Sequence, residues 1–189
     1  MNYLFHLHLS DPEPLCRIGN LMGDFVKGRL EEHLWHPQIF CGLRQHRALD
    51  RFAHDHPAIL TSKNRISKRF GLLKPVLIDI FYDHFLAKNW EQWAGGNLED
   101  YSAEIYRLLR EYDAQLVHSF RPVARRMAET DWLSSYRDPK VIAQVLERVG
   151  HRLKRDNLLA EGIAELDRCG MGLEVDCLAF LQAARLANF

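Results

Sequence analysis

The chain lacks the features that mark several large classes of protein. Its four cysteines form no Cys-x-x-Cys pair, which argues against a thiolate zinc site or a redox motif. The opening MNYLFHLHLSDPEP has no basic region of the kind that starts a signal peptide. No apolar run approaches the ~20 residues of a membrane span. We therefore expect a cytoplasmic protein with reduced thiols.

Strand signals are equally scarce. There is no Asn-Gly or Asp-Gly hairpin between alternating runs. The one alternating stretch, Tyr3–Leu9, can form a short strand or an extended segment on which His6 and His8 share a face. Elsewhere apolar residues recur every three or four positions, as in helices, over Leu15–Val26, Ile39–Phe52, Leu72–Trp93, Leu98–Leu116, Val141–Leu153 and Leu158–Leu166. The sequence predicts a single all-α domain over residues 1–189, with about seven to nine helices.

Several helix boundaries can also be predicted. Asp138 followed by Pro139 is typical of an N-cap and the first helical position, and Pro57 can begin another helix. Gly150 and Gly170 stand where helices are expected to end.

The helix predicted within Leu72–Trp90 carries an electrostatic anomaly. Asp79 and Asp83 are four residues apart, so a helix places both carboxylates on one face. No Lys or Arg stands three or four residues from either of them. Burying such carboxylates is costly unless they are protonated or meet a cation. A metal ion would provide that cation.

Two other segments offer further ligands. Asp24 follows Asn20 by one turn in an apolar stretch, and His46 and Asp50 stand four residues apart on one predicted helix face. Ordinary surface pairing is the alternative for each segment, since Lys27 can pair with Asp24 and Arg47 with Asp50.

Taken together, these side chains predict a metal site. Carboxylates and imidazoles turned inward from several helices are the usual way to bind metal in a helical bundle. A carboxylate-rich set with His suits Mn²⁺, Mg²⁺ or Fe²⁺, and such ions favour hydrolysis of phosphate esters. His6 either lines the same site, bonds the substrate or has a structural role. The six candidates are Asp24, His46, Asp50, Asp79, Asp83 and His84.

Charge is unevenly distributed although the chain is neutral overall. Residues 44–74 contain eight basic and two acidic side chains. This basic segment could steer an acidic partner or a phosphate-bearing substrate, or could be a solvated helix face. The neutral total, and the absence of a helix-turn-helix signature or interleaved aromatics, argue against nucleic acid.

Four motifs resemble the acyl carrier protein phosphodiesterase family. They are MNYLFHLHLS, IGNLMGDFVKG, GLRQHRALDRF and LIDIFYDHFLAKNW, and they occur in the family's order over residues 1–90. Weaker likeness continues through YRDPKVIAQVLERVGHRL. The family is regarded as a divergent branch of the all-helical, metal-dependent HD phosphohydrolases. Membership implies hydrolysis of holo acyl carrier protein of fatty acid biosynthesis to apo carrier protein and 4′-phosphopantetheine, with Mn²⁺ as the typical metal.

The resemblance also implies roles for individual residues. Asp24, Asp83 and His84 would be catalytic, and apart from the resemblance Arg47 or Arg44 is available beside them to clamp phosphate oxygens. The implied metal ligands are Asp24, His46, Asp50, Asp83 and His84, although HD proteins usually present the adjacent pair as His-Asp. Residues expected to support these ligands or contact the substrate are His6, Asn20, Arg44 and Asp79.

An acidic carrier protein would also explain the basic segment. The residues expected to bind it are Arg51, Lys63, Arg65, Lys68 and Arg69. Two alternatives remain open at this stage. One is an HD-type phosphohydrolase that acts on a nucleotide or cyclic nucleotide, and the other is a non-enzymatic helical module that binds an acidic protein.

Overall fold

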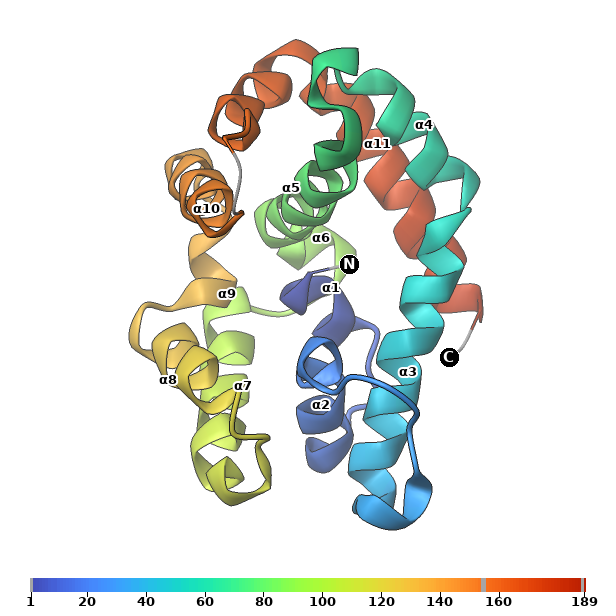
Figure 1. The fold of residues 1–189 in the computed structure, drawn as a ribbon, viewed down its shortest axis with the longest axis vertical. Helices are drawn as coiled ribbons and strands as arrows, with labels where there is room; N and C mark the ends of the chain where they lie inside the picture. The colour runs from blue at the N-terminus through green and yellow to red at the C-terminus, as the bar shows by residue number, and fades with distance from the viewer. Residues whose placement is uncertain (1, 154–155, 188) are drawn as a thin grey trace.

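The fold is all-α, as predicted. The computed structural model describes residues 2–153, 156–187 and 189, and over these ranges it contains eleven α-helices, five short 3₁₀ helices and no strand (Figure 1). Eight of the described α-helices have eight or more residues, which agrees with the predicted seven to nine. No helix in the described ranges is long and apolar enough to cross a membrane.

The α-helices are α1 Tyr3–His8, α2 Pro14–Leu21, α3 Pro37–His54, α4 Pro57–Arg65, α5 Lys74–Lys88, α6 Trp90–Trp93, α7 Leu98–Glu111, α8 Arg121–Glu129, α9 Trp132–Ser135, α10 Pro139–Arg152 and α11 Ala164–Ala187. The 3₁₀ helices are η1 Gly23–Phe25, η2 Glu32–Leu34, η3 Lys68–Leu73, η4 Asp113–Gln115 and η5 Leu159–Ile163.

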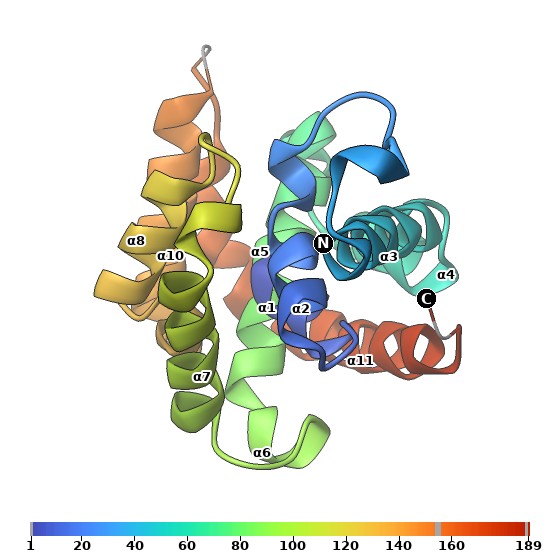
Figure 2. The ribbon, with the colours of Figure 1, turned by 90° about the horizontal axis from the view of Figure 1, so that it is seen from below.

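Helix α5 is the centre of the molecule. It contacts α1, α4, α10 and α11. From Leu77 to Ala87, every residue except Asp79 is buried. A helix that is apolar on all sides is stable only when other elements surround it. Figures 1 and 2 show α5 between α3, α4 and α11 on one side and α7 to α10 on the other.

Helices α2 and α3 pack unusually close together because each has a glycine that faces the backbone of the other helix. A Cβ atom at Gly19 would lie 2.2 Å from the carbonyl oxygen of Ile39, and one at Gly42 would lie 1.9 Å from that of Cys16. Any side chain at either position would push the helices apart. This approach brings the end of α2 next to the middle of α3, where His46 lies.

Two of the predicted helix boundaries are confirmed and two are wrong, since α10 continues through Gly150 to Arg152. The Asp138 side chain accepts a hydrogen bond of 2.8 Å from the backbone N–H of Lys140 at the start of α10, and Pro57 begins α4. Gly170 does not end a helix, because α11 continues through it from Ala164 to Ala187. Glycine lowers helix stability by only about 1 kcal/mol, and the buried face of α11 outweighs that cost.

The prediction of an extended segment over Tyr3–Leu9 is also wrong, because Tyr3–His8 forms α1. The Asp83 carboxylate explains the difference. Its two oxygens accept hydrogen bonds of 2.9 Å from the backbone N–H groups of Leu4 and Phe5. These N–H groups have no partner within the helix, so the carboxylate from α5 caps α1.

The helical conformation separates the two histidines that an extended segment would align. His6 is buried at 2% exposure and faces α3, whereas His8 accepts a hydrogen bond from Arg185 and packs against Trp90. Burial raises the pKa of Asp83 to about 7, and its hydrogen bonds to Leu4 and Phe5 oppose that rise. The anomaly at Asp83 is thus resolved by a helix N-terminus.

We expect Asp83→Ala to destabilise the protein by about 3 kcal/mol, because two buried N–H groups lose their acceptor at ~1–3 kcal/mol each. Asp138→Ala is the matched control, since it removes an exposed N-cap and should cost about 1 kcal/mol. Urea denaturation of the metal-free proteins measures both values. Equal losses in the two variants would contradict the proposed role of Asp83.

Candidate metal centre

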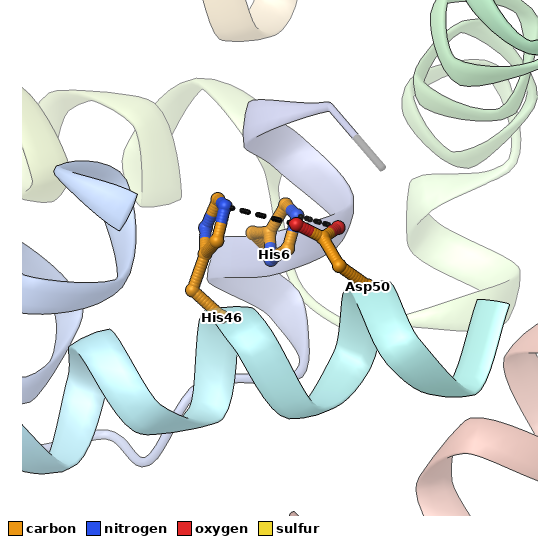
Figure 3. A group of neighbouring side chains, drawn as sticks. All are labelled: His6, His46 and Asp50. Carbon is orange, nitrogen blue, oxygen red and sulfur yellow. Dashed lines mark ion pairs between the residues drawn. The ribbon is translucent and has the colours of Figure 1, made fainter. Parts of the chain in front are cut away.

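Three side chains from α1 and α3 converge on one point (Figure 3). His6, His46 and Asp50 each offer a ligand atom, and these atoms lie within 4.8 Å of one another. His46 Nε2 is 3.2 Å from Asp50 Oδ2, and His6 Nε2 is 3.3 Å from Asp50 Oδ1. The spacing of four residues on α3 puts His46 and Asp50 on one face, as predicted, and α1 supplies His6 from across the interface.

The ring of His46 is fixed in one orientation. Its Nδ1 lies 2.9 Å from the carbonyl oxygen of Asn20, which can only accept, so Nδ1 carries the proton. Nε2 then faces Asp50 and also Asp24, whose Oδ1 is 3.6 Å away. Gly23 allows the ring this position, since a Cβ there would lie 2.1 Å from the imidazole. The sequence pattern did not identify Gly23, because its role depends on α3.

His6 has the free nitrogens that a metal ligand requires. Neither of its ring nitrogens has a hydrogen bond of good geometry within the described residues, although both are buried. Its ring stacks on that of His46 with centroids 3.8 Å apart. Burial lowers the pKa of His6 to about 4, although Asp50 opposes this shift, and His46 contributes to it. His6 is therefore a neutral imidazole at pH 7, which is the form that binds metals.

The charges around His46 favour a cation. Burial alone would lower its pKa, but hydrogen bonds to Asp24 and Asp50 raise the pKa of His46 to about 9. The bond to His46 in turn lowers the pKa of Asp24 below its usual value. In Asp50, burial raises the pKa, but the two histidines outweigh it and the pKa falls. A proton or a metal ion can satisfy this excess of negative charge.

The donor set fits a divalent cation. Two imidazole nitrogens and an adjacent carboxylate, with Asp24 as a second carboxylate, are typical ligands of first-row transition metals. The hydrogen bond from His46 to the Asn20 carbonyl is the kind of support that metal-binding histidines usually have. The side chain of Asn20, by contrast, takes no part in this support.

Asp79 lies beside this group and connects it with two cavities. It is half-buried, and burial followed by the charges of Asp50 and Asp24 raises its pKa. Asp24 and Asp79 both line a cavity of about 360 Å³ between α3, α4 and α5 and another of about 290 Å³ between α5 and α8 to α10. A substrate bound at the group can thus extend in two directions.

The structure does not bring Asp83 and His84 into the group. Both oxygens of Asp83 accept hydrogen bonds from α1, and His84 Nδ1 donates to the carbonyl of Tyr136 at 2.8 Å. Burial lowers the pKa of His84. The ligand roles of Asp83 and His84 stay predictions. The sequence did not predict these contacts, because the helical period specifies a face but not the element packed against it. Among the described residues, His6, His46 and Asp50 form the one such group of three or more side chains.

The predicted phosphate-binding arginines lie on a different face of α3. The Arg47 guanidinium donates hydrogen bonds to the carbonyls of Gly28 and Val26 at 2.8 and 2.9 Å. These bonds hold the loop after Asp24 against α3. Arg44 lies over the ring of Phe40 at 6.0 Å. With Arg51 they line a separate cavity of about 640 Å³. The structure thus places Arg47 and Arg44 away from the group, and their contact with substrate phosphate stays a prediction.

The basic segment is also less available than its composition indicates. Arg65 pairs with Asp176 at 2.7 Å, and Arg69 pairs with Glu161 at 2.6 Å. Arg51 and Lys68 are exposed. Lys63 donates to the carbonyl of His54 and lines the cavity of about 360 Å³ beside the group.

Comparison with known proteins agrees with the motifs. The family model described as acyl carrier protein phosphodiesterase matches residues 1–184. A protein of that name from Photorhabdus laumondii is 29% identical over 173 residues, covering 89% of this chain and 85% of the relative. One from Yersinia pestis is 26% identical over 181 residues, covering 95% and 93%. One from Escherichia coli O6:H1 is 27% identical over 168 residues, covering 88% and 86%.

No solved structure matches the chain. The family match nevertheless includes every residue of the group and of both cavities that share Asp24 and Asp79. The chain belongs to the acyl carrier protein phosphodiesterase family.

Proposed function

We propose that this protein hydrolyses the phosphodiester that joins 4′-phosphopantetheine to a serine of holo acyl carrier protein. The observation that carries the proposal is the convergence of His6, His46 and Asp50 in a chain that belongs to this family. A bond forms between a water oxygen and phosphorus, and the bond from phosphorus to the serine oxygen breaks. The serine oxygen takes up a proton, and the phosphate leaves with pantetheine.

A divalent cation would be held by His6, His46 and Asp50, with Asp24 as an additional carboxylate. Such a cation lowers the pKa of a water molecule and neutralises phosphoryl oxygens. Mn²⁺ suits this mixture of imidazole and carboxylate donors, and Mg²⁺ or Fe²⁺ are the alternatives. Asn20 orients His46 through its carbonyl, and Asp83 positions His6 through α1.

The carrier protein would approach from the cavity between α3, α4 and α5. Lys63 lines this cavity, and exposed Lys68 follows on η3. Acyl carrier proteins are acidic, so these cations would attract one toward the metal group. A cytoplasmic location and a common origin with HD phosphohydrolases remain predictions of the sequence.

The direct test is a mass measurement on holo acyl carrier protein incubated with the purified protein and Mn²⁺. We expect the carrier protein to lose the mass of the phosphopantetheine arm, and the loss to stop when a chelator is added. A panel of nucleotides and cyclic nucleotides serves as the comparison. Turnover of a nucleotide with an intact carrier protein would contradict the proposal.

Metal binding separates the roles of two neighbouring carboxylates. Asp50→Asn should weaken Mn²⁺ binding by about 100-fold or more, because a ligand loses its charge and even supporting residues contribute about 10- to 100-fold. Asp79→Asn should retain the metal and slow hydrolysis, since Asp79 lies beside the group rather than in it. Elemental analysis and titration with Mn²⁺ measure the difference. Loss of metal in Asp79→Asn alone would reverse the two assignments.

A further inference from the structure

The cavity between α5 and α8 to α10 has a mostly apolar wall. Its volume is about 290 Å³, close to the lower end of the ~300–1,000 Å³ typical of small-ligand sites. Aliphatic side chains come from Ile80, Val123 and Val149, and the rings of Tyr3 and Trp132 stack at 6.1 Å on another side. Such a wall suits methyl and methylene groups.

Two cations on α10 complete this cavity. Arg148 and Arg152 are one turn apart and both line it. Neither guanidinium makes an ion pair with an acidic residue in the described ranges, and Arg148 bonds only the carbonyl of Gln144 at 3.2 Å. By contrast, Arg65 and Arg69 each have a carboxylate partner. Unpaired arginines at a cavity are suited to phosphate and carbonyl oxygens.

The acidic wall of this cavity lies beside the metal group, because Asp24 Oδ1 is 3.6 Å from His46 Nε2. Asp24 and Asp79 are lining residues both here and in the cavity of about 360 Å³ on the other side. A phosphodiester has two arms, so a site that cleaves it needs room for both. The cavity beside Lys63 opens next to the basic α4–η3 region, which suits an acidic protein. The apolar cavity is left for the other arm.

We propose that the cavity lined by Tyr3, Trp132, Val149, Arg148 and Arg152 binds the phosphopantetheine arm. This inference rests on the proposed function. The aliphatic and aromatic wall packs against the dimethyl and methylene groups of the arm. Arg148 and Arg152 bind the phosphate of the arm and its nearest amide carbonyl. The phosphate gains negative charge when the phosphodiester becomes a monoester.

Calorimetric titration of the Mn²⁺-loaded protein with free 4′-phosphopantetheine tests this assignment without catalysis. Val149→Trp fills the cavity, and the double variant Arg148→Gln/Arg152→Gln removes the cations without changing the core. We expect each to weaken binding by roughly tenfold or more, because it removes desolvated packing or charge-assisted hydrogen bonds. Arg125→Gln/Arg126→Gln on α8 is matched in charge and should bind like the wild type. Thermal melting confirms that the variants are folded.

The outcomes separate this inference from the proposed function. Wild-type affinity in both cavity variants, or no binding of 4′-phosphopantetheine to the wild type, would overturn the arm site. The mass assay on holo carrier protein is run in parallel. Hydrolysis by the wild type and by both cavity variants at equal rates would leave the proposed function standing and reject the arm site. Binding that depends on the cavity, without any hydrolysis, would support the arm site and reject the function.

Discussion

Two hydrogen bonds between the Asp83 carboxylate and the first turn of α1 determine where His6 lies. A helix of six residues is too short to be stable alone. The buried carboxylate on α5 satisfies the N–H groups that such a helix leaves free, and it fixes the direction of the helix. His6 then faces His46 and Asp50 on α3. The central helix therefore acts on the candidate metal centre indirectly, by holding the helix that carries His6.

Two unfavourable energy terms arise in the group of His6, His46 and Asp50 when no cation is bound: excess negative charge and an unsatisfied imidazole nitrogen. Asp24 and Asp50 direct negative charge at His46 Nε2, while Asn20 holds the proton of that ring on Nδ1. Without a cation the nitrogen lone pair of buried His6 would be unsatisfied, since this ring makes no hydrogen bond of good geometry to any described residue. A divalent ion removes both costs. In the proposed reaction, the two adjacent cavities would give each arm of the phosphodiester a separate path away from the ion.

Local patterns predicted local features well. The helical period gave the all-α fold, and the spacing of His46 and Asp50 correctly placed both on one face of α3. Tertiary partners could not be predicted in this way. The hydrogen bonds from α1 to Asp83 were not foreseen, because Tyr3–Leu9 was expected to be extended. The partner of Arg65 was not foreseen either, because Asp176 is 111 residues away in the sequence. The close approach of Gly23 to His46 depends on how η1 packs against α3.

A crystal structure of the protein with Mn²⁺, with anomalous scattering measured at the manganese edge, tests the account most directly. We expect a manganese peak coordinated by ligand atoms from His6, His46 and Asp50, with Asp83 still bound to the N–H groups of Leu4 and Phe5. A manganese peak coordinated by Asp83 and His84, with α1 displaced from Asp83, would contradict it.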